Sequence, residues 1–592
     1  MLTNLSPSQR EAVCCGMGPC EVIAGPGSGK TLVLTERILY LISHFEIAPS
    51  RILVLTFSRS AAAEMKGRFD LRTSGNYPGV VFGTFHSVFF HILKESTHHD
   101  YKILSGAVRD RLLSRLLCRY YPDPLDRPSL EEAEKIVRSA SSFGRTQDED
   151  IRRDYRLFLK ENGYVDFDDM ILECRNVLTA DRKVREYWSR RFAAILVDEF
   201  QDINAEQYAI LRLLSSGRGL FVVGDDDQSI YGFRGSDPGI MMRFMKDFAD
   251  AERIFLSLNY RCSGCICRAA SLLISENRIR IPKEMTSAGP MGDRTVLTGF
   301  EKDSGEMRYL LRELRKLAPE ELTDTAVIVR TNKHAVKIEK YLTENGIAVS
   351  GKTGVPQNIR SAVIRDLTAY LLLADGARKN MYQRNALFRV MNRPQRFILR
   401  SAAPSEYMSA EALLTHSGRP DPGVQELLED LAVLRTLAPE GFVRYLYYSI
   451  GYAEWAAGNL GGKDQVRAAL DRILEEISPL RDLGEMRRAL QKEELPQRDP
   501  DVRGVRIMTM HVSKGLEFSR VYLPALNEGI IPGRRCRTVE DYEEERRLLY
   551  VAMTRARSHL ELMYTKGTVK NPRPPSRFLS VYGIRNFVSS GR

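Results

Sequence analysis

The stretch Ala24-Gly-Pro-Gly-Ser-Gly-Lys-Thr31 has the pattern of a P-loop, and it lies directly behind the apolar run Glu21-Val-Ile-Ala24. Ala24 stands where such a loop usually has its first glycine. In a P-loop the backbone N–H groups converge on phosphate oxygens, the lysine reaches the outer phosphates and the final hydroxyl ligates Mg²⁺. The run from Leu32 to Ile42 indicates a helix whose N-terminal dipole favours an anion. The stretch therefore predicts a nucleotide site made of Ala24, Gly25, Pro26, Gly27, Ser28, Gly29, Lys30 and Thr31.

Upstream of this loop, Ser6-Pro-Ser-Gln9 opens a helix, with Ser6 at the N-cap, Pro7 in the first turn and Gln9 at the reciprocal capping position. Capping is a sufficient explanation of Gln9. Its place shortly before the loop leaves a second interpretation open, in which its amide recognises the edge of an adenine.

Downstream of the loop, strand patterns alternate with helical patterns. The apolar runs Ile52 to Phe57 and Val80 to Phe82 predict two strands. Such alternation predicts a parallel sheet, whose ligands gather at the carboxyl ends of the strands. Phe57, Phe85 and His86 fall at such ends. A pair of aromatic rings placed there suits base stacking, although a single Phe is more often part of a core.

Paired carboxylates follow a later strand pattern. The apolar run Ala193 to Val197 leads directly into Asp198 and Glu199. A strand that delivers two carboxylates is the expected partner of a P-loop. Asp198 is predicted to hold Mg²⁺, and Glu199 is predicted to orient and deprotonate an attacking water.

The next polar segment is Asp225-Asp-Asp-Gln228-Ser-Ile-Tyr231-Gly-Phe233-Arg234-Gly235. Three consecutive carboxylates followed by aromatic and basic residues are not typical of a core. We interpret this segment as a loop that contacts a phosphate at one end and a nucleic-acid strand at the other. Further along, Tyr260 suits base stacking and Arg261 suits the role of an arginine finger.

A second alternating unit begins with the strand pattern Thr325 to Val329 and resumes with Val505 to Met510. Between them, residues 357–500 carry apolar stripes at helical spacing, which predict a helical insertion. In the last helix pattern most charges form ordinary i,i+4 pairs, whereas Arg555 near its end suits a nucleotide contact. The predicted organisation is a first sheet domain of residues 1–87 and 188–258 with insertion 88–187, a second of 259–356 and 501–565 with insertion 357–500, and a basic tail of 566–592.

Composition narrows the class of protein. The 592 residues carry a formal net charge of +11, which is consistent with a polyanionic partner. The sequence contains neither a long apolar run nor a basic segment followed by an apolar one at the N-terminus, so we expect a cytoplasmic protein without membrane contact. The nine cysteines do not form a disulfide pattern.

Taken in order, the motifs closely resemble those of the superfamily 1 DNA helicases of the UvrD/Rep/PcrA type. The resemblance extends from Leu5 to Arg557. It rests on the strings AGPGSGKT, GTFHS, LVDEFQD, GDDDQSIYGFRG, NYR, HVSKGLEF and EEERRLLYVAMTRA. It implies an α/β fold with two RecA-like P-loop NTPase motor domains, each a parallel sheet with a mostly helical insertion, the second shorter than usual.

The resemblance also implies roles around an ATP–Mg²⁺ site between the two motors. Gln9 and Tyr260 would hold the adenine, and Thr31 and Asp198 the Mg²⁺. Gln228 would sense the γ-phosphate. The predicted catalytic set is Lys30, Asp198, Glu199, Gln228, Arg261 and Arg555, and Glu517 is a further nucleotide contact from the second motor.

The same resemblance implies that single-stranded DNA crosses both motors and that the protein acts on single-stranded and tailed duplex DNA with 3′ to 5′ polarity. The implied DNA contacts are Phe57, Phe85, His86, Tyr231, Phe233, Arg234, Arg330, Asn332 and His511. One alternative is an ATP-dependent clamp or scaffold subunit of a repair or defence complex that does not unwind DNA. The sequence does not identify protein partners.

Overall fold

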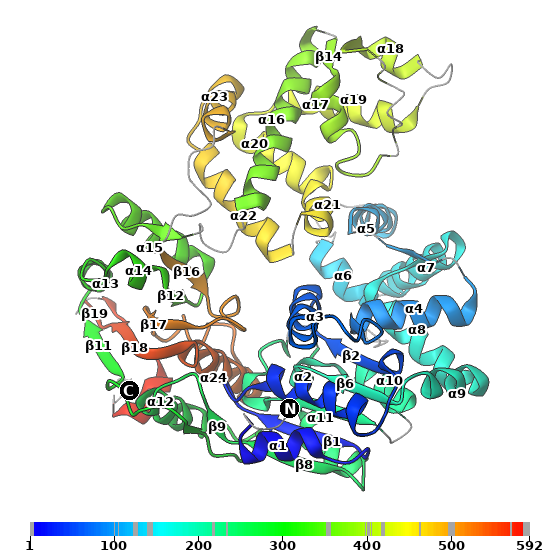
Figure 1. Cartoon of the computed structure of the whole chain (residues 1–592). Coiled ribbons are helices and arrows are strands. Elements are labelled where there is room, and N and C mark those ends of the chain that lie inside the picture. The colour runs from blue at the N-terminus through cyan, green and yellow to red at the C-terminus, as the bar shows by residue number, and fades with distance from the viewer. Residues whose placement is uncertain are drawn as a thin grey trace. The chain divides into compact units, whose positions relative to one another are not determined.

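The computed structural model describes residues 5–99, 101–104, 106–121, 128, 130–138, 146–215, 219–232, 235–350, 357–379, 381–396, 398, 403, 405–415, 421–460, 463–494, 504–568 and 571–583. The chain forms two compact units (Figure 1). The sheet unit comprises Met1–Asp100, Phe167–Thr353 and Arg503–Arg592. The helical unit comprises Tyr101–Asp166 and Gly354–Val502.

The first sheet of the sheet unit has six strands in the order β3-β2-β6-β7-β1-β8, and every neighbouring pair is parallel. Strands β1, β2, β6 and β7 are buried along their whole length, as expected for a parallel sheet covered on both faces. The predicted parallel sheet is therefore confirmed. Its strands are β1 (Cys20–Ala24), β2 (Ile52–Thr56), β3 (Val81–Thr84), β6 (Ala194–Val197), β7 (Leu220–Gly224) and β8 (Glu252–Leu256).

A second six-stranded sheet lies in the same unit, in the order β11-β18-β17-β12-β16-β13, and it is also parallel throughout. Segments far apart in sequence meet here, because β12 lies between β16 and β17. The second predicted alternating unit is thus confirmed. Its strands are β11 (Val296–Phe300), β12 (Thr325–Val329), β13 (Val349–Ser350), β16 (Val505–Thr509), β17 (Phe518–Leu523) and β18 (Ala556–Thr565).

Helices surround both sheets and bury an apolar core against them. They are α1 (Pro7–Cys14), α2 (Lys30–Ser43), α3 (Arg59–Thr73), α4 (Phe85–Thr97), α8 (Phe167–Ala180), α9 (Arg182–Arg191), α10 (Ala205–Ser215), α11 (Gly239–Asp247), α12 (Gly264–Ile274), α13 (Asp303–Leu314), α14 (Pro319–Thr323), α15 (Asn332–Glu344) and α24 (Val539–Met553). Short elements complete the unit: η1 (Pro49–Arg51), η2 (Phe200–Asp202), η3 (Asp226–Gln228), η7 (Arg577–Tyr582), β9 (Leu258–Asn259), β10 (Thr286–Ser287), β19 (Gly567–Thr568) and β20 (Asn571–Pro572).

The helical unit has its own core, which includes the two predicted stripes on α19 and α22. Its helices are α5 (Gly106–Tyr120), α6 (Leu130–Arg138), α7 (Thr146–Asn162), α16 (Gln357–Lys379), α17 (Arg384–Val390), α18 (Ala410–Thr415), α19 (Pro422–Leu434), α20 (Pro439–Arg444), α21 (Tyr452–Asn459), α22 (Lys463–Ile477) and α23 (Leu483–Glu494). It also contains the π-helical turn η6 (Tyr445–Ser449) and the short strands β4 (Lys102–Ile103), β5 (Tyr164–Val165), β14 (Met381–Gln383) and β15 (Tyr407–Ser409). Within the described residues, no helix is long and apolar enough to span a bilayer.

The two compact units divide the chain differently from the predicted domains. Residues 88–100 and 167–187 belong to the sheet unit, and the segments 101–166 and 354–502 form one unit together. Both sheets also belong to a single unit. The division into two motor domains, each with its own insertion, therefore stays a proposal.

The three consecutive aspartates Asp225, Asp226 and Asp227 are buried, each with no measurable exposure. Lys283 Nζ lies 3.0, 2.6 and 2.8 Å from their carboxylates, and Arg280 donates two hydrogen bonds to Asp227. A phosphate contact by this loop stays a prediction, but the expectation that these carboxylates lie outside the core was wrong. They form a buried ion cluster whose cations come from a later segment of the chain.

Replacing Lys283 with Met is expected to lower stability by about 3–5 kcal/mol, because breaking a buried ion pair leaves uncompensated carboxylates. The measurement is the thermal unfolding midpoint followed by circular dichroism. Lys316→Met is the matched control, since Lys316 also pairs with a carboxylate, Glu313 at 2.8 Å, but is exposed. That surface pair is worth only about 0–1 kcal/mol. Equal midpoints for the two variants would contradict the structural role of the cluster.

Candidate active site

The P-loop connects the end of β1 to the start of α2, as predicted. Gly27 and Gly29 have φ angles of 65° and 87°, which side-chain-bearing residues rarely adopt. The space around these two residues also requires glycine. A Cβ atom on Gly27 would lie 2.6 Å from Arg261 Cβ, and one on Gly29 would lie 2.7 Å from Gln9 Nε2. Both glycines therefore let Gln9 and Arg261 approach the loop closely.

Gln9 is buried and makes the predicted capping box with Ser6. Its Nε2 also donates a hydrogen bond of 2.9 Å to the carbonyl oxygen of Ser28 in the loop. The side chain thus joins α1 to the P-loop. Recognition of adenine by this amide stays a prediction.

Lys30 and Glu199 face one another at the loop, with Lys30 Nζ 3.9 Å from Glu199 Oε1. Lys30 Nζ is buried and makes no hydrogen bond with any residue that the structure describes. A buried ammonium without hydrogen-bond partners is costly, so this position suits an anionic ligand. Glu199 has a φ of 50°, a conformation that is uncommon for residues other than glycine.

The carboxylates of Asp198 and Glu199 are electrostatically different although they are adjacent. Burial, together with the negative charge of Glu199, raises the pKa of Asp198 to about 7. Burial opposes ionisation of Glu199 as well, but the positive charges of Lys30 and Lys514 outweigh it and lower the pKa of Glu199 to about 2. The site therefore keeps Glu199 ionised at neutral pH.

Lys514 belongs to the turn that follows β16 of the second sheet, yet its ammonium lies among the first sheet's carboxylates. Nζ donates hydrogen bonds to Asp202 Oδ2 at 2.6 Å and to the carbonyl oxygen of Gln228 at 3.0 Å. It is also 3.6 Å from Glu199 Oε2. Lys514 had no predicted role, although it follows the carboxyl end of a parallel strand, where ligands gather.

Gln228 is buried, and its Nε2 donates a hydrogen bond of 2.7 Å to Asp225 of the ion cluster. An amide nitrogen has a second N–H group to donate. The predicted role of Gln228 as a γ-phosphate sensor stays a prediction.

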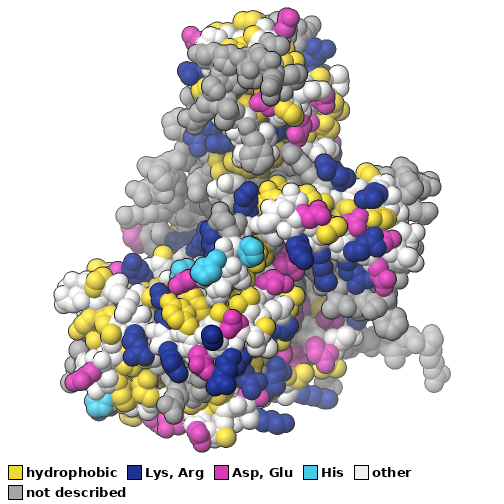
Figure 2. Space-filling model, turned by 90° about the vertical axis from the view of Figure 1, so that its right-hand side faces the viewer, with side chains coloured by type: hydrophobic (Ala, Val, Ile, Leu, Met, Phe, Trp, Pro, Cys, Tyr) yellow, Lys and Arg dark blue, Asp and Glu magenta, His cyan; other side chains and the backbone are white. Residues whose placement is uncertain are grey.

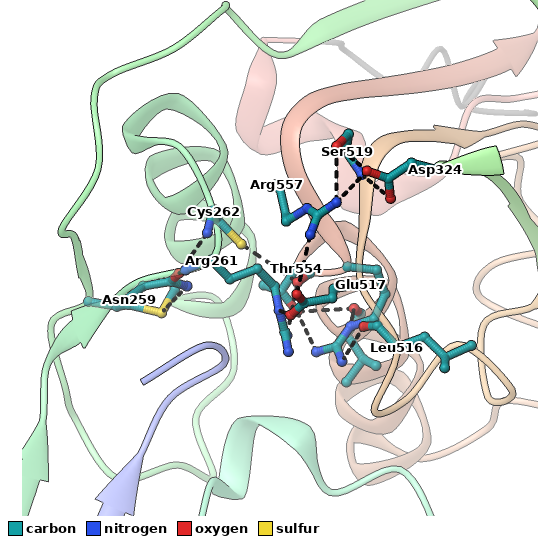
Figure 3. Close-up of polar contacts among 12 residues, drawn as sticks. Asn259, Arg261, Cys262, Asp324, Leu516, Glu517, Ser519, Thr554 and Arg557 are labelled. Carbon is teal, nitrogen blue, oxygen red and sulfur yellow. Dashed lines mark hydrogen bonds and ion pairs between the residues drawn. The ribbon is translucent and has the colours of Figure 1, made fainter. Parts of the chain in front are cut away.

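Arg261 is directed toward the second sheet (Figure 3), where its Nε donates to Glu517 Oε2 at 2.7 Å. Asn259 sets this direction, because its Oδ1 accepts hydrogen bonds from the backbone N–H groups of Arg261 and Cys262. Glu517 is also 3.5 Å from Arg557. Asn259 and Arg557 had no predicted role, yet they hold the two predicted nucleotide contacts Arg261 and Glu517.

Arg555 is buried at the end of α24, and its described hydrogen-bond acceptors are the oxygens of Val551, Leu516 and Thr554. Among the described residues no carboxylate lies within ion-pair distance of its guanidinium. Burial, with the positive charge of Arg261, lowers the pKa of Arg555 to about 9. A desolvated cation beside a second cation suits an anion.

Tyr260, predicted to hold the adenine, is 52% exposed, so its ring is accessible to a base.

The predicted DNA contacts on the first sheet differ in accessibility. Phe57 and Tyr231 stack on one another with their ring centres 5.3 Å apart and an interplanar angle of 10°. His86 contacts Phe167 edge to face. Phe85 is only 2% exposed and packs against Phe89. The burial of Phe85 contradicts the predicted base contact, because a ring inside the core cannot stack on a base.

The remaining predicted DNA contacts lie on the second sheet or outside the described residues. Arg330 donates three hydrogen bonds to Glu545, so a carboxylate already neutralises its charge. Asn332 is exposed at the start of α15, and His511 is half-buried after β16. The predictions for Phe233 and Arg234 fall outside the described residues.

Basic side chains are also exposed away from the strand ends. Figure 2 shows Lys and Arg side chains on the side of the molecule that carries α9 in Figure 1. On this helix the side chains of Arg182 and Arg190 are 82% and 81% exposed, and the two arginines share one carboxylate, that of Glu186. The positive charge of the chain is therefore available to a polyanion at the surface.

Comparison with known proteins identifies the family. A model of the UvrD/REP helicase N-terminal domain matches residues 5–117 and 120–249, and a model of the UvrD-like helicase C-terminal domain matches residues 254–404 and 458–567. YjcD of Bacillus subtilis (strain 168), provisionally named an ATP-dependent DNA helicase, is 31% identical over 97% of this chain and 81% of its own length. The chain belongs to the UvrD/REP helicase family.

Two further relatives agree with this assignment. The ATP-dependent DNA helicase PcrA of Bacillus subtilis (strain 168) is 29% identical, and PcrA of Staphylococcus aureus (strain Mu50 / ATCC 700699) is 28% identical. Each match covers 98% of this chain and 86% of the relative. The predicted resemblance is confirmed, and the chain is an enzyme of the UvrD-like helicase class with a P-loop.

The side chains of this UvrD-like enzyme fit a nucleotide and a hard cation. The buried Nζ of Lys30, which has no hydrogen-bond partner among the described residues, suits outer phosphates, and the desolvated guanidinium of Arg555 also suits an anion. Thr31 and Asp198 supply oxygen donors, which Mg²⁺ prefers. Nucleotide use follows from the family; the individual contacts remain proposals.

Proposed function

We propose that this protein is an ATP-dependent 3′ to 5′ DNA helicase or translocase that couples ATP hydrolysis between its two sheets to stepping along single-stranded DNA. The observation that carries the proposal is the set of contacts between the two sheets at the P-loop. Lys514 of the second sheet pairs with Asp202 of the first. Arg261, which pairs with Glu517 of the second sheet, lies against Gly27 of the P-loop. A ligand at Lys30 would thus affect both sheets. The PcrA relatives are named ATP-dependent DNA helicases, which supports the same activity.

The proposed hydrolysis assigns a task to each group. Lys30 and the backbone N–H groups of the loop bind the outer phosphates, and Thr31 and Asp198 hold Mg²⁺. Glu199, ionised at neutral pH, orients the attacking water and accepts its proton. Bound Mg²⁺ supplies charge neutralisation at the phosphates.

Two arginines and one amide complete the proposed site from either side of the phosphates. Arg261 and Arg555 stabilise the charge that develops on the transferred phosphoryl group. Arg261 first has to leave Glu517, and Arg557 is placed to keep the charge of that carboxylate compensated. Gln228 contacts the γ-phosphate, and a change at that contact moves the segment that carries Tyr231.

The proposed DNA path follows the strand ends of both sheets. Phe57 and Tyr231 would stack on bases, and His86, Asn332 and His511 would contact the strand nearby. Stacking worth about 1–3 kcal/mol per base tolerates any sequence, so we expect no strong sequence preference. Arg330 joins this path only if phosphate contact replaces its bonds to Glu545. Phe85 is not part of the proposal.

Strand displacement tests this function directly. With ATP and Mg²⁺, the protein is expected to separate a duplex with a 3′ single-stranded tail and to leave a 5′-tailed or blunt duplex intact. Gel-resolved release of a labelled strand is the measurement. ATP turnover that is stimulated by DNA, but without strand release and without removal of a protein roadblock, would favour the ATP-dependent clamp. Release from the 5′-tailed duplex alone would contradict the polarity.

A further inference from the structure

We propose that Lys514 is a positioning residue that links the DNA-contacting ring of Tyr231 to the carboxylates of Asp202 and Glu199, and thereby makes ATP hydrolysis dependent on DNA. This inference rests on the proposed function, because it assumes that Tyr231 contacts DNA and that Glu199 acts on water. The role is distinct from binding nucleotide or DNA, since Lys514 acts through other residues.

At the proposed site of hydrolysis, the ammonium of Lys514 contacts the carboxylates of Asp202 and of Glu199, the proposed general base. Its ammonium is 2.6 Å from Asp202 Oδ2 and 3.6 Å from Glu199 Oε2, and its side chain is only 10% exposed. Gln201 donates a hydrogen bond to the same oxygen of Glu199. Oε2 of Glu199 therefore faces an amide and an ammonium, whereas Oε1 faces Lys30 Nζ. Lys514 thus helps to fix the orientation of the Glu199 carboxylate.

On the DNA side, the same ammonium lies 5.0 Å from the ring centre of Tyr231 and 3.0 Å from the carbonyl oxygen of Gln228. Among the described residues, Phe57 stacks on the same ring. A base cannot lie between two rings that are already stacked. Binding a base on Tyr231 therefore requires this ring to separate from Phe57 or from Lys514.

The ring of Tyr231 and the carboxylates of Asp202 and Glu199 all contact the ammonium of Lys514, which sits on a flexible side chain. Base stacking and a cation–π contact are of comparable strength, so a base competes effectively for the ring of Tyr231. Movement of Tyr231 also shifts the segment that begins at Gln228, which is bonded to Lys514. Either change weakens the hold of Lys514 on Glu199. The carboxylate of Glu199 is then free to reorient toward the attacking water, and hydrolysis is faster when DNA is present.

The experiment that tests this role measures the stimulation of ATPase activity by DNA in the full-length protein. The stimulation is the ratio of two kcat values, one with a saturating thymidine oligonucleotide and one without DNA. In Lys514→Met the basal rate is expected to rise and the ratio to fall by about 5- to 150-fold, the usual range of coupling between two sites. Lys316→Met is the control, because its lysine pairs with Glu313 at the surface of the same part of the chain.

Adding Tyr231→Leu completes a double-mutant cycle, which isolates the coupling of the two residues. If both act on one path, the second substitution changes the ratio little once Lys514 is gone. If Lys514→Met does not fold, Lys514→Arg keeps the charge but changes its geometry, and the ratio is expected to fall as well. An unchanged ratio in the Lys514 variant, or additive effects in the cycle, would overturn the inference. A wild-type protein whose ATPase ignores DNA would instead overturn the proposed function.

Discussion

Glu199→Gln is expected to lower kcat for DNA-stimulated ATP hydrolysis by about 10²- to 10⁴-fold, the usual contribution of a general base. The amide keeps the size of the side chain but cannot accept a proton from water. Lys30 and Lys514 favour the ionised form of Glu199, as its lowered pKa shows. Steady-state phosphate release with saturating ATP, Mg²⁺ and single-stranded DNA measures the effect.

Binding of nucleotide should survive this substitution, because Lys30 and the loop backbone remain. Titration with a fluorescent ATP analogue separates binding from chemistry. Glu313→Gln serves as the matched control, since Glu313 pairs with Lys316 at the surface. A wild-type kcat for DNA-stimulated ATP hydrolysis in Glu199→Gln would contradict the assignment of Glu199 as the general base. Removal of Mg²⁺ by a chelator is expected to abolish turnover in the wild type and the control alike.

The parts of this site that were predictable from sequence are those that local rules place together. A P-loop follows a buried strand, and paired carboxylates follow another strand of the same parallel sheet. Because the carboxyl ends of parallel strands share one edge, Lys30 was expected near Asp198 and Glu199. The structure places Lys30 Nζ 3.9 Å from Glu199.

The parts that were missed depend on partners that are remote in sequence. Asp225 to Asp227 were expected to lie outside the core, because the cations that neutralise them, Arg280 and Lys283, come more than fifty residues later. Lys514 is 312 residues away from Asp202. No periodicity or local motif encodes such a pairing, since it arises only when two sheets pack together.

The predicted base contact of Phe85 was wrong for a different reason. A strand end can direct an aromatic ring toward a ligand or into the core, and the sequence pattern is the same in both cases. Here the ring lies at the first turn of α4, against Phe89 on the next turn. The buried face of an amphipathic helix decided its position.

Arg555→Gln is expected to lower kcat by about 10³- to 10⁵-fold, the range of an arginine finger in phosphoryl transfer. The guanidinium is desolvated, and the described residues bring no carboxylate to it. With Arg261 nearby, its pKa falls to about 9, so the positive charge is poorly compensated by the protein alone. A phosphoryl group with growing negative charge relieves this imbalance, which is why the contact is expected to be strongest in the transition state.

The kinetic pattern distinguishes this role from a structural one. Loss of transition-state stabilisation lowers kcat and leaves the Kd for a fluorescent ATP analogue within a few-fold of wild type. Arg555→Lys keeps the charge but not the planar fork, so kcat is expected to lie between those of the wild type and the Gln variant. Arg312→Gln is the control, because the Arg312 side chain on α13 is 64% exposed. A variant with wild-type kcat, or one whose entire loss follows a lower unfolding midpoint, would refute the assignment of Arg555 to the phosphates.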